Sequence, residues 1–370
     1  MKTRNREWLE RKLLEIRARE SYIADRTNES IARQYGLAAT DIVKLNYNEN
    51  LYISKEKLVA LLKEVAEQSD LRIYPQEEES KLREEIAKYL RIEKDCIVIG
   101  NGSDELIDRN SRFFLQKGDK AVSITPTFPV FGHCVKYQDA EIVGIPLQDD
   151  FTINIEQTLK SFTQNTKLLY LCSPNNPTSN QFSQDDIETL IEEFPGVVLI
   201  DEAYGEYADY SAVPLIGKYK NLIVLRTFSK AFGLASLRVG YAVTNADLAT
   251  ALEKKPTPYP VSAVSLSMGR KILQNLPLVQ ESIKALKTER EKLIKRLNEI
   301  GGTRAFDSQA NFVLFNVTKP YVEVYQSLLE LGIIIKKSGR ILHLDNCLRT
   351  TVGLPQMNDK LLEALERIIG

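Results

Sequence analysis

The sequence predicts an α/β protein with a mainly parallel sheet flanked by helices, followed by a smaller α+β domain. From about residue 96 to residue 243, short apolar runs alternate with helical patterns, as expected where each strand is followed by a crossover helix. The runs lack polar alternation, which is typical of strands covered on both faces. After a proline-rich break at residues 254–263, long charged helices and short strands replace this pattern.

The elements can be assigned in order along the chain. The N-terminal stretch "MKTRNREWLERKLLEIRARE" is charged and amphipathic, which predicts a helix. Strands are expected in "CIVIG", "KAVSIT", "KLLYLCSP", "GVVLIDEAY", "NLIVLRTFSK" and "VGYAV", with helices in "SDELIDRNSRFFLQKG", "FPVFGHCVKY" and "SQDDIETLIEEF". Beyond the break, "NFVLFNV", "GIIIKK" and "CLRTTV" predict strands between the long helices and a terminal helix "NDKLLEALERII". We divide the chain into an N-terminal helical arm (1–45), a large domain (46–260) and a small domain (261–370). The arm is expected to pack with the small domain or a dimer partner.

Composition narrows the class of protein. The 370 residues exceed the usual size of a single core. The 49 basic residues balance 50 acidic residues, so no overall field favours nucleic acid or acidic lipid. The four cysteines are scattered without a CxxC pattern, which argues against a disulfide framework and a metal site. With neither a signal peptide nor an apolar run of membrane-spanning length, the sequence predicts a cytoplasmic protein.

Polar residues follow the predicted strands at their carboxyl ends, where parallel sheets bind ligands. In "IGNGSDELIDR" a glycine turn precedes a helix for which Ser103 or Asp104 is a suitable N-cap. The N-terminus of such a helix suits a phosphate, although a plain capped turn is the alternative. The pattern matches neither of the glycine-rich nucleotide motifs.

Two further strand ends carry polar groups. "SPNNPT" places two side-chain amides after one strand. Asp201 directly follows four apolar residues, where an ionised carboxylate is costly without a partner. A solvated strand end is the alternative interpretation of Asp201.

The segment "TFSKAFGLASLR" brings Ser229, Lys230 and Arg238 close together. A lone Ser-Lys pair is usually a surface feature, but the combination with Asp201 indicates one cofactor. A lysine amine can form an imine with an aldehyde, a buried aspartate can keep a pyridine nitrogen protonated, and a helix start with Ser229 and Arg238 can hold a phosphate. Pyridoxal 5'-phosphate carries all three groups.

Beyond these residues, the chain resembles the fold-type I pyridoxal-phosphate aminotransferases, and within them the histidinol-phosphate aminotransferase family. Seven motifs occur in the family's order: "NEN", "RIYP", "GNGSDE", "SPNNPT", "DEAY", "TFSKAFGLASLR" and "LRTTVG". The resemblance implies a seven-stranded main sheet and transamination between histidinol phosphate and 2-oxoglutarate in histidine biosynthesis. The products would be imidazole acetol phosphate and glutamate, formed through a Lys230 aldimine.

The resemblance also implies roles for individual residues. Lys230, Asp201 and Tyr204 would be catalytic, with Asp201 on the ring nitrogen and Tyr204 and Asn176 on the phenolic oxygen. Phe128 would stack on the ring. The phosphate would lie among Gly102, Ser103, Asp104, Ser229 and Arg238. Tyr74 would reach the cofactor of a partner subunit, which implies a homodimer with shared sites. Arg349, Lys336 and Asn48 would bind substrate.

The chain departs from the family pattern at four positions, namely Leu51, Ser179, Ser236 and Lys336. Leu51 replaces a proline, and Ser179 and Ser236 replace glycines. A positive φ at Ser179 would be costly unless Asn180 adopts it instead. Lys336 replaces an arginine and offers charge without the planar fork, although Lys337 and Arg340 could compensate.

Other functions remain open within the resemblance. An aromatic or broad-specificity aminotransferase would use the same cofactor, as would a lyase like the threonine-phosphate decarboxylases. Aminotransferase-like domains also serve as effector sensors in transcription regulators that carry a DNA-binding domain. The roughly 45 residues before the first motif are too few and too balanced in charge for a winged helix.

Overall fold

The computed structural model describes residues 2–19, 26–254 and 257–370. Part of the predicted arm (20–25) and part of the proline-rich break (255–256) lie outside the described residues. Within them, the strands form a seven-stranded sheet, a four-stranded sheet and a two-stranded pair. None of the described helices is long and apolar enough to cross a membrane.

The seven-stranded sheet is mainly parallel, as predicted. Its order is β2-β8-β7-β6-β5-β3-β4, and only β8 runs antiparallel to its neighbours. The interior strand β7 is buried at every position, which explains why its sequence lacks polar alternation. The strands are β2 (Ile97–Gly100), β3 (Lys120–Thr125), β4 (Glu141–Pro146), β5 (Thr166–Cys172), β6 (Val197–Asp201), β7 (Leu222–Thr227) and β8 (Gly240–Thr244).

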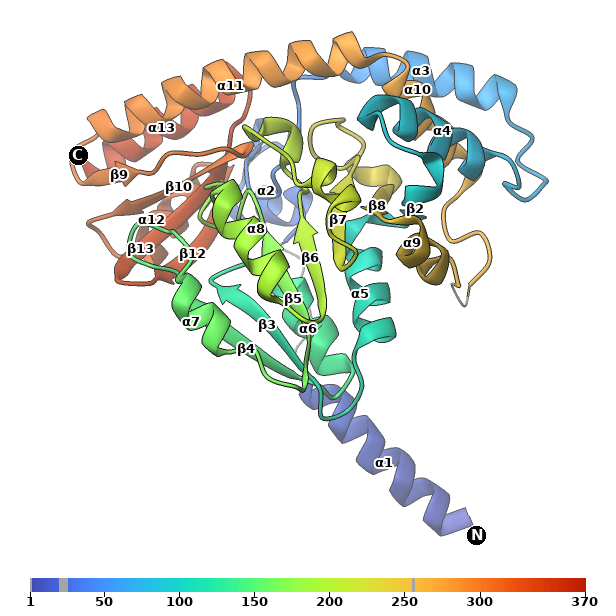
Figure 1. Ribbon diagram of the computed structural model, residues 1–370. Helices are drawn as coiled ribbons and strands as arrows, with labels where there is room; N and C mark the ends of the chain where they lie inside the picture. The colour runs from blue at the N-terminus through green and yellow to red at the C-terminus, as the bar shows by residue number, and fades with distance from the viewer. Residues whose placement is uncertain (1, 20–25, 255–256) are drawn as a thin grey trace.

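Helices cover both faces of this sheet (Figure 1). One face packs against α5 (Gly102–Phe114), α6 (Pro129–Tyr137) and α9 (Ala246–Leu252). The opposite face packs against α4 (Glu78–Leu90), α8 (Gln184–Glu193) and α10 (Ala263–Leu273). The alternation of the strand residues decides which core each side chain joins: Leu169 and Leu171 point to the second face, whereas Leu168 and Tyr170 point to the first. Two further helices are α3 (Lys55–Gln68) and α7 (Ile155–Lys160).

The four-stranded sheet is antiparallel, in the order β12-β13-β10-β9. Its strands are β9 (Thr303–Ala305), β10 (Phe312–Val317), β12 (Lys336–Ile341) and β13 (Leu344–Thr351). The helices α11 (Leu276–Glu299), α12 (Tyr321–Glu330) and α13 (Pro355–Ile369) belong to the same part of the chain. The short strand β1 (Val43–Lys44) pairs with β11 (Ile333–Ile334), which brings the "NYNEN" loop alongside β13.

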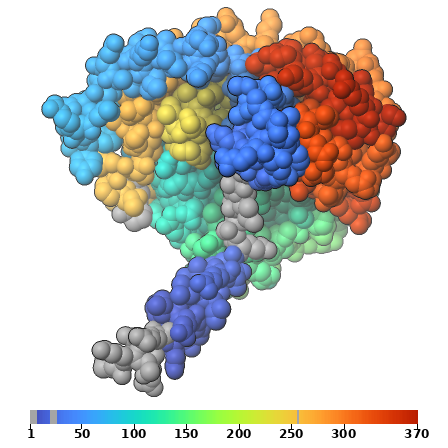
Figure 2. All heavy atoms as spheres, turned by 180° about the vertical axis from the view of Figure 1, so that it is seen from behind, coloured from blue at the N-terminus to red at the C-terminus, as the bar shows by residue number. Residues whose placement is uncertain are grey.

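The helix predicted in the N-terminal arm is α1 (Lys2–Ala18), which projects away from the rest of the molecule (Figure 1, Figure 2). Arg19 ties its end to the body through an ion pair with Asp139 at 3.1 Å. A second arm helix, α2 (Asn28–Tyr35), buries Ile31 against Leu329 and Ile334.

Several element boundaries differ from those predicted. The helix α5 begins at Gly102 with Asn101 at the N-cap position and no side-chain cap, so the prediction of Ser103 or Asp104 as the N-cap was wrong. The strand β7 ends at Thr227 rather than at Lys230 because the Thr227 hydroxyl accepts a hydrogen bond from the Ser229 N–H at 3.1 Å and starts a turn. The run "GIIIKK" divides into β11 and β12, which pair with different strands.

Candidate active site

A cavity of about 860 Å³ lies at the carboxyl ends of the parallel strands. The large sheet, the start of α5, the loop at residues 46–48 and strands β12 and β13 all contribute to its wall. The structure brings nearly all the predicted site residues together there: Asn48, Ser103, Asp104, Phe128, Asn176, Asp201, Tyr204, Ser229, Lys230, Arg238, Lys336 and Arg349. Gly102 lies directly beneath the Arg238 side chain. Tyr74 does not line this cavity. Its exposed ring stacks on Tyr259.

Lys230 presents a reactive amine to the cavity. Its Nζ donates a hydrogen bond to the carbonyl oxygen of Tyr47 at 2.8 Å and lies 5.8 Å from the centre of the Tyr204 ring. Burial, and next the positive charge of Arg349, lowers the pKa of Lys230 to about 8. A lysine amine becomes a nucleophile and a base when it loses its proton. The environment therefore brings the loss of the Lys230 proton closer to physiological pH.

Asp201 lies at the end of β6, opposite Cys172 of β5 in the sheet register. Its side chain is buried, and its carboxylate accepts hydrogen bonds from the Tyr170 hydroxyl at 2.7 Å and from the Ala203 N–H at 3.0 Å. Burial raises the pKa of Asp201 to about 6, while these two hydrogen bonds oppose the rise. A buried carboxylate of this kind can pair with a positively charged group of a ligand, such as a protonated ring nitrogen.

Arg238, Ser229 and the first turn of α5 form a cradle. The Arg238 guanidinium donates hydrogen bonds to Asp104 at 2.9 Å and to the Ser229 hydroxyl at 3.3 Å. Gly102 has a φ of +81°, and a Cβ atom there would lie 2.7 Å from Arg238 Nη2. A serine hydroxyl, a guanidinium and the N–H groups of a helix start are the donors that a phosphate requires. This donor set fits the phosphate of pyridoxal phosphate.

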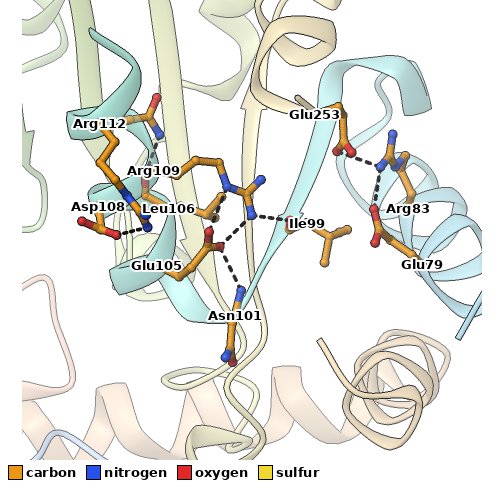
Figure 3. Close-up of polar contacts among 11 residues, drawn as sticks. Glu79, Arg83, Ile99, Asn101, Glu105, Leu106, Asp108, Arg109, Arg112 and Glu253 are labelled. Atoms are coloured by element: carbon orange, nitrogen blue, oxygen red, sulfur yellow. Dashed lines mark hydrogen bonds and ion pairs between the residues drawn. The ribbon is translucent and has the colours of Figure 1, made fainter. Parts of the chain in front are cut away.

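Two residues behind this cradle were not recognised from the sequence (Figure 3). Glu105 accepts a hydrogen bond from the Asn101 N–H at 3.2 Å and pairs with Arg109 at 2.7 Å. Arg109 in turn donates to the Ile99 carbonyl of β2 at 3.4 Å. The pair fixes the glycine turn to the end of β2. Its spacing of four residues in "SDELIDR" is the sequence signal that could have revealed it.

Arg349 connects the two sheets. Its guanidinium donates to the Asn176 side-chain oxygen and to the Asn46 carbonyl, the latter at 2.8 Å. Lys336 faces Arg349 across the β12–β13 ladder, so two cationic side chains share one part of the cavity wall. Asn48 donates to the Tyr204 hydroxyl at 2.9 Å.

The structure shows how two of the four departures from the family pattern are accommodated. Ser179 itself adopts a φ of +66°, so Asn180 does not take over the left-handed conformation. The Ser179 hydroxyl and carbonyl both form hydrogen bonds across to the chain near residues 307–309, at 3.2 and 2.8 Å, which helps to offset the strain. Ser236 is exposed in a 3₁₀ turn and its φ is not positive, so it does not require glycine.

The comparison with known proteins decides the family. The family model "Aminotransferase class I and II" matches residues 40–365. The chain belongs to the class I and II aminotransferases. This aminotransferase depends on pyridoxal phosphate, and its substrates are an amino donor and an oxo acid. The predicted resemblance and fold are confirmed.

Relatives and solved structures resemble the aminotransferase over most of its length. A histidinol-phosphate aminotransferase of Caldanaerobacter subterraneus is 36% identical, over 88% of this chain and 93% of the relative. One of Methanosarcina mazei is 36% identical, over 99% and 98%. The crystal structure of a histidinol-phosphate aminotransferase from Sinorhizobium meliloti with pyridoxal-5'-phosphate has a TM-score of 0.84 at 24% identity, covering 94% of this chain and 95% of that one. At that identity the structural match shows the fold alone.

Proposed function

We propose that this aminotransferase transfers the amino group of histidinol phosphate to 2-oxoglutarate, in the cytoplasm, as a step of histidine biosynthesis. The observation that carries the proposal is the pair of cations Arg349 and Lys336, which face each other on the cavity wall. A phosphate monoester carries about two negative charges near neutral pH, whereas the carboxylate of an ordinary amino acid carries one. Relatives named histidinol-phosphate aminotransferase, at 36% identity over 88% and 99% of this chain, support the same substrate.

The chain's own residues would hold the cofactor at four points. Ser229, Arg238 and the first turn of α5 would bind its phosphate, because they present the convergent donors described above. Asp201 would pair with the protonated ring nitrogen. Asn176 and Tyr204 would bind the phenolic oxygen, and Phe128 would cover the ring. The chemistry supplied by bound pyridoxal phosphate is an aldehyde for the amine and an electron-withdrawing ring.

Lys230 would carry out the proton transfer. Its neutral Nζ would remove the proton from the Cα atom of the amino donor, and general-base catalysis of this kind is most effective when the pKa of the base lies near the working pH. The lowered pKa of Lys230, about 8, meets that condition. Arg349, with Lys336 and Asn48 beside it, would hold the anionic end of the substrate and so orient Cα toward Lys230.

We also propose a homodimer in which Tyr74 serves the partner's site. The Tyr74 side chain is 74% exposed and lies outside the cavity of its own chain. Leu71 and Ile73 beside it are also largely exposed. An exposed group of large apolar side chains is typical of an interaction surface.

The substrate proposal is tested by offering histidinol phosphate, phenylalanine and threonine phosphate separately with 2-oxoglutarate. We expect glutamate from histidinol phosphate, with kcat/KM about tenfold or more above that for phenylalanine, because the phosphate gains the second charge-assisted contact. Carbon dioxide without glutamate from threonine phosphate would favour the lyase reaction instead. Equal kcat/KM values for phenylalanine and histidinol phosphate would favour a broad-specificity aminotransferase.

The proposed phosphate cradle is tested by Gly102→Ala. The new methyl group would displace the Arg238 guanidinium, which lies 2.7 Å from its position, so we expect pyridoxal phosphate to bind about tenfold more weakly. The matched control is Gly118→Ala, since Gly118 also has a positive φ of +92° but no atom within 4 Å of the added Cβ. Equal cofactor dissociation constants for the two variants, measured by titration, would contradict the cradle assignment.

A further inference from the structure

Few groups stabilise the charged form of the Asp201 carboxylate. The side chain is 2% exposed, and among the described residues it forms no ion pair with a lysine or arginine within the salt-bridge distance. Its two oxygens accept hydrogen bonds from one backbone N–H and one side-chain hydroxyl, that of Tyr170. Because burying a carboxylate is costly, losing either donor would shift the balance toward the protonated acid.

Tyr170 is built to donate to this carboxylate. It lies on β5, two residues before the position opposite Asp201, and therefore on the same face of the sheet. The side chain is completely buried, with its ring stacked on Phe131 at 4.5 Å between centres. Burial raises the pKa of Tyr170 well above its usual value, so the hydroxyl keeps its proton. Tyr170 does not line the cavity, so it acts through Asp201.

Two nearby carboxylates affect the pKa of Asp201 in the opposite sense to the Tyr170 hydrogen bond. The charges of Asp104 and Glu202 raise the pKa of Asp201, whereas the Tyr170 hydrogen bond lowers it. The titratable and charged groups that act on Asp201 or line the same cavity come from β5, the turn after β6, the start of α5 and the segment after β7: Tyr170, Cys172, Glu202, Tyr204, Asp104, Lys230 and Arg238. Of these, the Tyr170 hydroxyl is the side chain that donates directly to the carboxylate.

We propose that Tyr170 is a positioning residue whose hydroxyl holds the Asp201 carboxylate in its charged form and in a fixed orientation, ready to pair with the ring nitrogen of pyridoxal phosphate. The pairing part of this proposal rests on the proposed role of Asp201. Tyr170 thereby sets the lower pH limit for cofactor binding, because a protonated Asp201 cannot stabilise a protonated ring nitrogen.

The test compares Tyr170→Phe with Tyr241→Phe. Both changes remove one hydroxyl from a fully buried tyrosine of the same sheet, but the Tyr241 hydroxyl has no hydrogen-bond partner among the residues that the structure describes. The first readout is the carboxyl ¹³C NMR titration of Asp201 in the full chain freed of cofactor, with the signal assigned by its loss in Asp201→Asn. We expect the midpoint to rise by about one pH unit in Tyr170→Phe, as expected for loss of a hydrogen bond to a charged group. Tyr241→Phe should leave the midpoint unchanged.

The second readout is the dissociation constant of pyridoxal phosphate from about pH 5 to about pH 8. In Tyr170→Phe the acid-side loss of affinity should begin about one pH unit higher, and affinity near neutral pH should fall several-fold. In the Asp201→Asn background, Tyr170→Phe should cause no further pH-dependent loss, because no charge remains to be held.

The outcomes separate this proposal from the proposed function. A Tyr170→Phe midpoint equal to that of Tyr241→Phe overturns the role of Tyr170. A raised midpoint with an unshifted affinity profile overturns the link to cofactor binding. A wild-type chain without measurable affinity for pyridoxal phosphate refutes the proposed role of Asp201, and the NMR midpoint then decides by itself whether Tyr170 holds the charge.

Discussion

Replacing Lys230 by alanine is expected to abolish transamination while leaving the chain folded. The change removes the amine that would take the proton from Cα, and general-base catalysis of this kind contributes about 10² to 10⁴ in rate. The proposed covalent attachment of Lys230 to the cofactor would also be lost, which would add to this effect. Among the described residues, the Lys230 side chain forms one hydrogen bond, from Nζ to the Tyr47 carbonyl, so its removal should leave the surrounding strands intact. The measurement is glutamate formation under saturating amino donor.

Two further variants serve as controls for the loss of the amine and for the loss of a lysine elsewhere. Lys230→Arg keeps a cation but cannot act as a base near neutral pH, and it should be as inactive as the alanine variant. Lys271→Ala removes a half-buried lysine that pairs with Glu64 away from the cavity, and it should retain activity. Residual activity within about tenfold of the wild type in Lys230→Ala would disprove the assignment.

The pH dependence of Lys230 gives a second measurement. Because its pKa is lowered to about 8, the amine gains its reactive neutral form as pH rises through that value and loses it as pH falls. The rate at which pyridoxal phosphate reacts with the cofactor-free protein should therefore be half-maximal at about pH 8 and level off roughly one pH unit above that. Borohydride reduction followed by mass spectrometry would locate the adduct on the peptide that contains Lys230.

The sequence was sufficient to predict the sheet and the convergence of Asp201, Lys230 and Arg238. Strands β6 and β7 are parallel neighbours and are buried at nearly every position, so the polar residues that follow them lie at one sheet edge. The strand β4 escaped prediction because only one of its six residues is buried, which leaves a weak apolar pattern.

Contacts between distant segments could not be predicted from local pattern. Arg349 and Asn176 are 173 residues apart, and they meet because β13 lies against the loop before Asn48 through the Thr351–Leu45 backbone hydrogen bond. Tyr170 sits inside an apolar run, where a tyrosine is an ordinary core residue and nothing nearby marks its hydroxyl. In the same way, Arg226 occurs in a buried strand without a neighbouring acid in sequence that would suggest its partners.

Arg226 holds together the segments that carry the proposed catalytic residues. Its guanidinium forms ion pairs with Glu202 at 2.9 Å and Glu206 at 2.7 Å, and all three side chains are almost completely buried. Glu202 follows Asp201, Glu206 follows Tyr204 by two residues, and Arg226 precedes Lys230 by four. The triad therefore joins the end of β6, the turn after it and the end of β7.

Arg226→Met is expected to lower the free energy of unfolding by about 3–5 kcal/mol, because it leaves two buried carboxylates without their cation. The cost should depend on pH. Burial already raises the pKa of Glu206 and the charge of Arg226 opposes that rise, so the variant raises this pKa further above its unfolded value. The variant then loses stability as pH rises from the unfolded pKa of Glu206 to its raised folded pKa. In urea unfolding, the loss of unfolding free energy relative to the wild type should be larger at about pH 8 than at about pH 5.

The triple variant Glu202→Gln/Arg226→Met/Glu206→Gln separates charge from packing. Replacing a whole buried group of ion pairs by uncharged side chains of similar size often changes stability little. The triple variant should therefore regain most of the lost stability, and its stability should no longer depend on pH in the way that the Arg226→Met variant does. A deficit that is equal at both pH values would mean that Arg226 contributes through packing rather than through its charge. If the triple variant regains stability but binds pyridoxal phosphate more weakly than the wild type, the ion pairs contribute to the placement of Asp201 and Lys230 beyond keeping the chain folded.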